Sequence, residues 1–340
     1  MVIPAVFYDA LFLEHETGEH VENRQRVLAA RQAILDSTFE VEWVTPTPAS
    51  EEAIARVHEP AYIDSVRRLA AEGGGWLDWD TAVSPRSFEA ALLAAGAGLG
   101  AVERALEKGQ RSFLLVRPPG HHAMPARGMG FCLFNNIAVA AAHALAEKGL
   151  ERVLIVDWDV HHGNGTQAAF SSDPHVLFVS SHQAGHYPGT GRAREVGTGA
   201  GAGYTVNVPL QPGDGDGAVR LIFERLVEPL GREFQPQLIL VSAGYDAQAG
   251  DPLGGLRFSQ EAYQWMAARL VSLAEEVGAA GPLCFLEGGY RPEVMARSIV
   301  ATLRGLRGEL PAFDPRPSSD EEADVRETLE ELRPYWRGVL

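Results

Sequence analysis

Seven short, nearly continuous apolar runs recur along the chain, and each is rich in β-branched or aromatic residues. In chain order they are AVFYDA, SFLLVRPPG, RVLIVDWDV, HVLFVSSH, YTVNVPL, LILVSAGYD and PLCFLEGGY. Continuous apolar runs of this length are typical of strands that are buried on both faces, whereas a half-solvated strand alternates apolar and polar positions. The pattern therefore predicts an α/β fold with a central, mostly parallel sheet of about eight strands flanked by helices on both faces.

The segments between these runs change to the 3.6-residue period of a helix. Three of them are FEAALLAAGAGLGAVERALEKG, NNIAVAAAHALAEKG and SQEAYQWMAARLVSLAEEVG. Each ends in glycine, which adopts the left-handed backbone at a helix C-terminus without steric cost. We therefore expect helices that end at Gly109, Gly149 and Gly278.

No internal repeat or low-complexity linker divides the chain into two halves. The glycine-rich stretches 197–203 and 213–217 are expected to be loops, and the charged stretch 318–340 is expected to be a helical tail. We interpret residues 1–340 as a single domain with a core over about 5–310, a size that large α/β domains reach.

Charge and cysteine content narrow the possible functions. With 29 Lys and Arg against 45 Asp and Glu, the formal net charge of -16 disfavours a nucleic-acid surface and would attract cationic substrates. Cys132 and Cys284 lie far apart in apolar runs without a CxxC pair, which indicates free buried thiols. The start MVIPAVFYDA has no basic segment of a signal peptide, and no run of 18 apolar residues occurs, so we expect a soluble cytoplasmic protein without membrane contact. Oligomeric state, including a homo-oligomer, stays open.

Polar clusters follow several of the apolar runs, at the strand ends where open parallel sheets build their sites. Asp159 and His161 are two residues apart on extended backbone and therefore point to the same side, and Asp246 follows another run. Each residue alone is more often a helix cap. Together, two carboxylates and one imidazole predict a divalent metal site with an open position for water.

Two further clusters suggest proton transfer and oxyanion stabilisation. The adjacent pair His121 and His122 follows one strand, and a neutral imidazole beside a metal-bound water can take its proton and return it to a leaving amine. Tyr290 follows the two glycines of EGGY, which let the backbone turn sharply toward the same strand ends. Its phenol could stabilise an oxyanion.

Taken in order, RPPGHHA, DWDVHHGNGTQ, SAGYDAQAGDPLGG and LEGGY resemble motifs of the zinc-dependent histone deacetylase superfamily, which includes acetylpolyamine amidohydrolases and acetoin-utilisation proteins. The resemblance implies the arginase-deacetylase fold. It also implies hydrolysis of an acyl amide, first of all acetyl, on a lysine side chain or lysine-like amine, releasing acetate and the free amine. Asn164 in HHGNGTQ and the run GDPLGG are similar to the class II branch.

The same resemblance assigns residues to roles. It implies one catalytic Zn²⁺ per chain, held by Asp159, His161 and Asp246. The residues implied to carry out catalysis are His121, His122, Tyr290, Asp157 and Asn164. In this scheme neutral His122, paired with Asn164, is the base, and His121 is kept protonated by Asp157.

Two potassium sites and a substrate tunnel are also implied. A first K⁺ would lie at Asp157, Asp159, His161, Ser180 and Ser181. A second would lie at Phe170, Asp173, Val176 and Tyr204. The tunnel positions are Gly130, Phe131, Tyr187, Leu253 and, at the rim, Asp80.

Three alternatives accompany this interpretation. A two-manganese ureohydrolase on the same fold needs aspartates where Gly163 and Gly244 stand. A non-catalytic acyl-ligand-binding protein would not need the paired histidines and Tyr290. An acetylpolyamine amidohydrolase fits the acidic charge, but polyamine-specific relatives carry glutamate where Leu253 stands, which favours acyl-lysine.

His15, His20, Glu22 and Arg24 lie in an early loop that borders the active-site mouth in relatives. A contact with substrate or with a neighbouring subunit is one interpretation of these residues. The other, which we favour, is a solvated loop.

Overall fold

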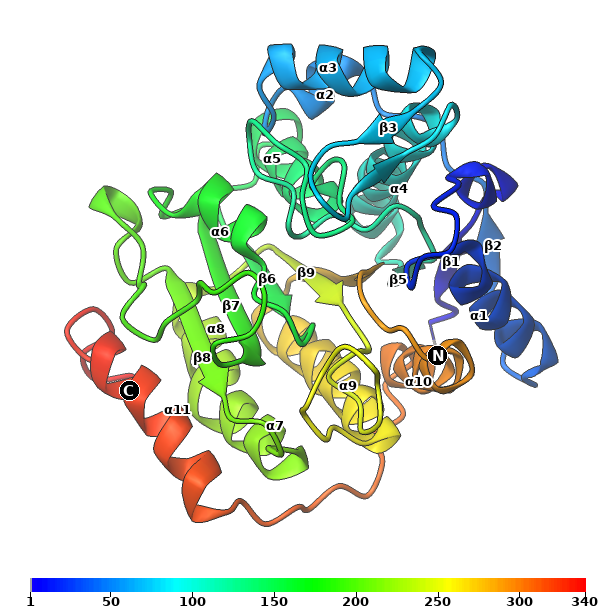
Figure 1. The fold of residues 1–340 in the computed structure, drawn as a ribbon. Coiled ribbons are helices and arrows are strands. Elements are labelled where there is room, and N and C mark those ends of the chain that lie inside the picture. Colours follow the sequence, from blue (N-terminus) through cyan, green and yellow to red (C-terminus); the bar gives the residue numbers. More distant parts are fainter. Residues whose placement is uncertain (1) are drawn as a thin grey trace.

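Eight parallel strands form one central sheet in the computed structural model, which describes residues 2–340 (Figure 1). Across the sheet the order is β2, β1, β5, β10, β9, β6, β7 and β8. Their bounds are β1 Ala5–Phe7, β2 Glu42–Val44, β5 Ser112–Leu114, β6 Val153–Asp157, β7 Val176–Gln183, β8 Thr205–Leu210, β9 Leu238–Ala243 and β10 Ala280–Leu286. A separate antiparallel hairpin joins β3 (Gly75–Trp76) to β4 (Ala82–Val83).

Each of the seven apolar runs contains one strand, so the predicted mostly parallel sheet of about eight strands is confirmed. The pattern missed β2 at one edge. Its residues Glu42 and Trp43 are exposed, and an edge strand with little buried surface leaves no continuous apolar run to find.

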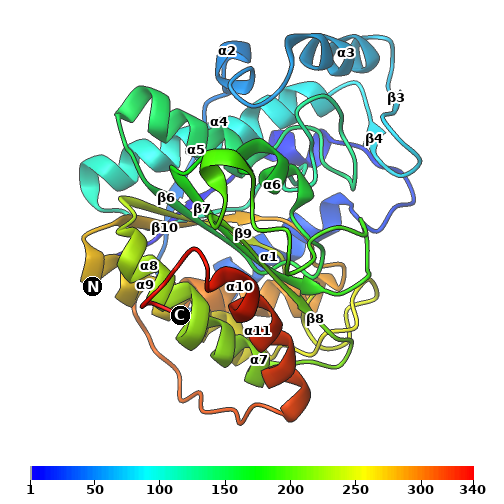
Figure 2. The ribbon, with the colours of Figure 1, turned by 90° about the vertical axis from the view of Figure 1, so that its left-hand side faces the viewer.

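Helices cover both faces of the sheet (Figure 2). One face is covered by α4 (Ser87–Lys108), α5 (Asn136–Lys148) and α6 (Asn164–Phe170), which share a hydrophobic cluster with the strands. The other face is covered by α1 (Arg24–Asp36), α7 (Asp216–Ile222), α8 (Glu228–Phe234), α9 (Gln260–Val277) and α10 (Pro292–Leu306). Two short helices, α2 (Glu51–Ile54) and α3 (Pro60–Ala71), lie outside α4. The helical turns are η1 (Ala10–Glu14), η2 (Gly199–Gly201) and the π turn η3 (Phe223–Val227).

The glycine rule for helix ends is confirmed. Gly109, Gly149 and Gly278 cap α4, α5 and α9 in the left-handed conformation, with φ of 63°, 68° and 73°. Both cysteines are buried and free, as expected. Among residues 2–340, no helix combines the length and the apolar character needed to cross a bilayer.

The charged tail forms α11 (Ser319–Leu332), which begins with a capping box between Ser318 and Glu321. It lies against the edge strand β8 and against α7 (Figure 1). The Thr328 hydroxyl donates to the carbonyl of Asn207 on β8 at 2.8 Å. Trp336 Nε1 donates to the Gly203 carbonyl at 2.7 Å, so the tail is fastened along the outermost strand.

Candidate metal centre and substrate tunnel

The parallel sheet brings three predicted ligands to one edge. β6 and β9 are neighbours in register, with Asp157 opposite Ser242. Asp159 and His161 follow β6, and Asp246 follows β9, so all three leave the carboxyl ends of adjacent strands. This position agrees with the rule that open α/β sheets place their sites outside the strand C-termini.

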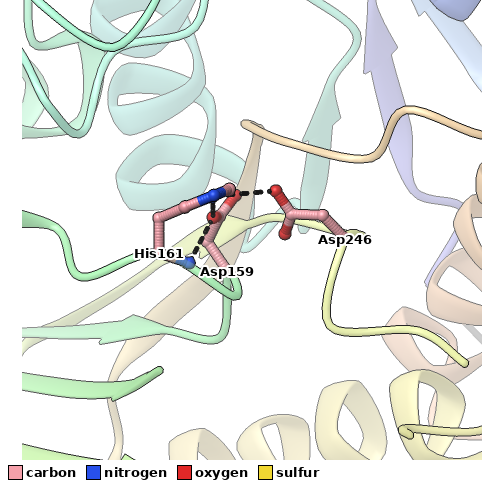
Figure 3. A group of neighbouring side chains, drawn as sticks. All are labelled: Asp159, His161 and Asp246. Atoms are coloured by element: carbon pink, nitrogen blue, oxygen red, sulfur yellow. Dashed lines mark hydrogen bonds and ion pairs between the residues drawn. The ribbon is translucent and has the colours of Figure 1, made fainter. Parts of the chain in front are cut away.

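The three side chains converge in a buried cluster (Figure 3). One potential ligand atom from each lies within 4.8 Å of the others. His161 Nδ1 is 3.1 Å from Asp159 Oδ1 and 3.2 Å from Asp246 Oδ2. Ligands about 2.0–2.1 Å from a tetrahedral zinc lie roughly 3.3 Å apart, so the spacing suits such an ion. Asp246 Oδ2 is buried, and apart from its ion pair with His161 it accepts no hydrogen bond, which leaves a lone pair for a metal.

Electrostatics also favour a cation at this cluster. Burial alone would lower the pKa of His161, but the carboxylates of Asp159 and Asp246 outweigh it and raise the pKa to about 10. A proton on His161 therefore offsets part of the negative charge of the two carboxylates. A divalent ion would take the place of that proton, because metal binding to imidazole and carboxylate releases protons. Among residues 2–340 this is the one group of three or more His, Cys, Asp or Glu side chains close enough to hold a metal.

Two glycines pack so closely against the carboxylates of Asp159 and Asp157 that neither position has room for a side chain. A Cβ at Gly244 would lie 2.0 Å from Asp159 Oδ2, and a Cβ at Gly163 would lie 2.3 Å from Asp157 Oδ2. These are the two positions where a two-manganese centre needs aspartate. The packing therefore agrees with a one-metal site.

The adjacent histidines are buried beside the cluster and have different partners. His121 Nδ1 is 2.9 Å from Asp157 Oδ2, and His122 Nδ1 is 2.7 Å from Asn164 Oδ1. The His121 pKa rises to about 10 because the negative charges of Asp157, Asp159 and Glu287 outweigh the effect of burial. The His122 pKa falls well below its usual value through burial and the nearby His121 and His161. One histidine is thus cationic and the other neutral near pH 7.

The turn that carries Tyr290 is fixed along its backbone. Gly288 N–H donates to Asp159 Oδ2 at 2.8 Å, and Arg26 Nε donates to the Gly289 carbonyl at 2.7 Å. Tyr290 N–H donates to Asp251 Oδ2 at 2.7 Å. Burial raises the pKa of the Tyr290 phenol well above its usual value, so the phenol keeps its proton and can donate a hydrogen bond.

A tunnel of about 370 Å³ leads to the cluster. All five predicted tunnel positions line it, namely Gly130, Phe131, Tyr187, Leu253 and Asp80. His122, His161 and Tyr290 lie in its wall as well. The lining residues outside the predicted tunnel positions include Trp79, which is 79% exposed, and His186, which stacks on His161 at a ring distance of 4.9 Å.

The expectation of a solvated early loop is wrong for two of its four residues. His15 and Glu22 are buried, and Glu22 forms a two-oxygen ion pair with the buried Arg117, at 2.6 and 2.7 Å. Arg26 also reaches Glu22, at 3.0 Å. A charged loop can be buried when its charges are paired inside the protein, and the partner Arg117 lies 95 residues away, which local sequence patterns do not reveal.

His20 packs its ring edge-on against Phe131, one of the tunnel-lining residues, at a ring distance of 4.6 Å. Phe131 itself has a φ of 70°, a rare conformation for a residue other than glycine. It follows Gly130, where a Cβ would lie 2.4 Å from the His122 ring. The wall is therefore packed directly against the neutral histidine.

The residues predicted for potassium fall into two groups in space. Asp157 pairs in register with Ser180, so the ends of β6 and β7 bring the first set together. The second set brackets the start of β7: the Tyr204 carbonyl accepts from Phe178 N–H at 2.9 Å, and the Phe170 carbonyl from Asp173 N–H at 3.0 Å. Potassium at either group stays a prediction.

Both the sequence and the fold match known proteins. A family model described as a histone deacetylase domain matches residues 20–306. "Histone deacetylase 14, chloroplastic" from Arabidopsis thaliana is 43% identical over 277 residues, covering 77% of this chain and 64% of that protein. "Polyamine deacetylase HDAC10" from Homo sapiens is 39% identical over 343 residues, covering 94% of this chain and 50% of that protein. The crystal structure of the HDA15 HD domain has a TM-score of 0.92 at 35% identity, covering 99% of this chain and 96% of that one. The chain thus spans less than two thirds of the Arabidopsis protein and half of the human one.

Proposed function

Because the chain belongs to the histone deacetylase domain family, we propose that it is a zinc-dependent amidohydrolase that removes an acyl group, first of all acetyl, from a primary amine such as the lysine side chain. The observation that carries this proposal is the buried cluster of Asp159, His161 and Asp246 at the end of a narrow tunnel. Two carboxylates and one imidazole form a donor set that suits zinc and leaves a coordination position open.

The tunnel residues would bind an extended acyl-amine stem. Phe131, Tyr187 and Leu253 supply apolar walls, which match a stem of methylene groups and exclude water from the amide. When bound, zinc would polarise the acyl carbonyl and lower the pKa of a water molecule. Tyr290, with its phenol protonated, would donate a hydrogen bond to the carbonyl oxygen as negative charge develops there.

The paired histidines would have different roles, proton transfer for His122 and charge stabilisation for His121. The Asn164 amide oxygen can only accept, so His122 donates through Nδ1 and keeps Nε2 free as a base. Neutral His122 would take the proton of the attacking water and deliver it to the leaving amine. His121, held as a cation by Asp157, would stabilise the developing negative charge without transferring a proton.

Acyl-lysine is the substrate class that the tunnel favours. Leu253 contributes an apolar side chain to the tunnel lining, at a position that we call the gate. Pairing with a second ammonium group of a polyamine would need a carboxylate there. Acetylpolyamine is the second candidate, because Asp78 and Asp80 lie at the tip of the β3–β4 hairpin and Asp80 lines the mouth.

We also propose that K⁺ occupies the two groups of residues at the ends of β6 and around the start of β7.

Metal analysis combined with hydrolysis of a fluorogenic acetyl-lysine substrate tests the proposal. One zinc per chain, with activity that a hydroxamate inhibits and Asp159→Ala abolishes, would support it. Asp36→Ala is the control, because Asp36 is an exposed carboxylate at the end of α1. Bound zinc without hydrolysis of any acyl amine would instead support a non-catalytic acyl-ligand-binding protein.

A second assay separates the substrate classes. The ratio of kcat/KM for an acetyl-lysine peptide and for acetylputrescine should favour the peptide. A large preference for acetylputrescine would overturn the acyl-lysine assignment and leave the reaction class intact.

A further inference from the structure

One carboxylate connects the turn of Tyr290 to the gate of the tunnel. Asp251 lies in the loop between β9 and α9, and its side chain is buried. Its Oδ2 accepts the N–H of Tyr290 at 2.7 Å, and its Oδ1 accepts the N–H of Leu253 at 3.0 Å. Two segments that follow different strands, β9 and β10, are thus held by the two oxygens of one side chain.

The bond to Tyr290 is the last of the backbone anchors along this turn. The preceding Gly289 has a φ of 118°, a conformation that side-chain-bearing residues rarely adopt. Because glycine has no Cβ, it restrains the backbone dihedrals of this turn little. Arg26 fixes the Gly289 carbonyl, but the peptide N–H that sets the direction of the phenol is fixed by Asp251. Without that acceptor, the Tyr290 backbone could rotate away from the tunnel.

The bond to Leu253 fixes the other side of the tunnel. The Leu253 carbonyl accepts from His186 Nε2 at 2.7 Å, so this residue is held at its N–H by Asp251 and at its carbonyl by His186. Leu253, His186 and Tyr290 all line the same tunnel. Asp251 therefore joins the backbone of Leu253 to the backbone of Tyr290, two residues of the tunnel lining.

We propose that Asp251 is a positioning residue, which aligns the Tyr290 phenol with the substrate carbonyl and holds the Leu253 gate in register with it. This inference rests on the proposed hydrolase function. Asp251→Asn has the same shape but offers one oxygen acceptor and one NH₂ donor, so one of the two N–H groups loses its partner and faces a donor. A displacement of about 1 Å at a catalytic group can cost about 10²-fold in rate.

The first test is a double-mutant cycle with Asp251→Asn and Tyr290→Phe, using trifluoroacetyl-lysine, whose activated carbonyl keeps slow variants measurable. In the wild-type background Asp251→Asn should lower kcat by about 10- to 100-fold. In the Tyr290→Phe background the same substitution should change kcat by less than about threefold, because the phenol that it positions is already gone. The loss of the bond to Leu253, which lines the tunnel, should then appear in KM. Equal losses in both backgrounds would overturn the proposal.

Asp216→Asn is the matched control. The Asp216 carboxylate also accepts one backbone N–H, from Ser259 at 2.8 Å, and lines no part of the tunnel. Its kcat should stay within about twofold of wild type. Zinc content should be equal in all variants.

A second measurement keeps the inference testable if Asp251→Asn does not fold. Hydrogen–deuterium exchange of the wild-type protein should find the amides of Tyr290 and Leu253 protected, and rapid exchange at both would refute the hydrogen bonds on which the proposal stands. This readout needs no turnover. A wild-type protein that hydrolyses no acyl amine yet protects both amides would refute the proposed function and leave the Asp251 geometry intact.

Discussion

Replacing Glu22 with glutamine should destabilise the fold far more than replacing an equally well-bonded surface carboxylate. Glu22 is fully buried and lies between Arg117 and Arg26, which are also buried. Removing its charge leaves two guanidinium groups in the interior without a counter-ion, and breaking a buried pair in this way costs about 3–5 kcal/mol. An unfolding entropy of about 2.1 cal/mol/K per residue gives about 0.7 kcal/mol/K for 340 residues. The melting temperature should therefore fall by about 4–7 °C.

The control has the same ion-pair geometry at the surface. Glu51 accepts from Arg67 through both oxygens, at 3.1 and 2.7 Å, but both side chains are 44% exposed. Exposed pairs contribute about 0.2–1 kcal/mol, so Glu51→Gln should lower the melting temperature by roughly 1 °C or less. Differential scanning fluorimetry at pH 7 measures both variants side by side.

The pH dependence of the melting-temperature difference between wild type and Glu22→Gln tests whether that difference is electrostatic. Burial alone would raise the pKa of Glu22, but Arg117 and Arg26 outweigh it and hold the pKa well below the usual value. A carboxylate with a depressed pKa in the folded state contributes its stability above its unfolded pKa of about 4.3 and loses it as the pH falls toward the folded pKa. The difference in melting temperature between wild type and Glu22→Gln should therefore be constant from pH 6 to 8 and should decrease below about pH 4. A difference in melting temperature under 1 °C at pH 7, or one that widens in acid, would contradict a buried charge on Glu22 as the source of the stability.

Three other outcomes are expected. Tyr290→Phe should lower kcat by about 10²–10³-fold in the fluorogenic assay, with zinc content unchanged, because in the proposed mechanism the phenol would donate to the oxyanion and would hold no metal. Asn164→Asp gives His122 a carboxylate partner, which should raise the His122 pKa and move the acidic limb of the kcat/KM profile to higher pH; an unmoved limb would contradict His122 as the base. Burial and the neighbouring Asp324 raise the pKa of Asp214 to about 6, so wild type loses stability as the pH rises from about 4 to 6. Asp324→Asn should therefore melt about 1 °C above wild type at pH 7.5 and at the same temperature as wild type at pH 4. A lower melting temperature of the variant at pH 7.5 would contradict a repulsion between Asp214 and Asp324.

Local motifs predicted the metal cluster because its geometry follows from two short pieces of chain. Asp159 and His161 share a face by spacing alone, and a parallel sheet brings Asp246 to the same edge. The buried ion pair of Glu22 and Arg117 could not be predicted in this way, because both residues look like ordinary surface charges until the fold places them together.

The limits of prediction are similar for the tunnel. Its five predicted positions came from the family resemblance, and all of them line the cavity. Asp251 lies within the GDPLGG motif, but its two backbone partners become visible only in three dimensions, since one of them is 39 residues away. Strand β2 pairs with β1 through backbone hydrogen bonds. Its largely exposed side chains give no sequence pattern from which that pairing could be predicted.

The placement of α11 bears on how this protein can be shortened for experiments. The family match ends at residue 306, whereas the helix that runs along β8 begins at Ser319. A chain cut at the family boundary would keep every residue of the tunnel but would expose the Asn207 carbonyl and the rest of an outermost strand. Unprotected strand edges pair with other chains, so such a fragment is expected to aggregate. We therefore expect the solubility of this protein in the test tube to depend on a helix that lines no part of the tunnel.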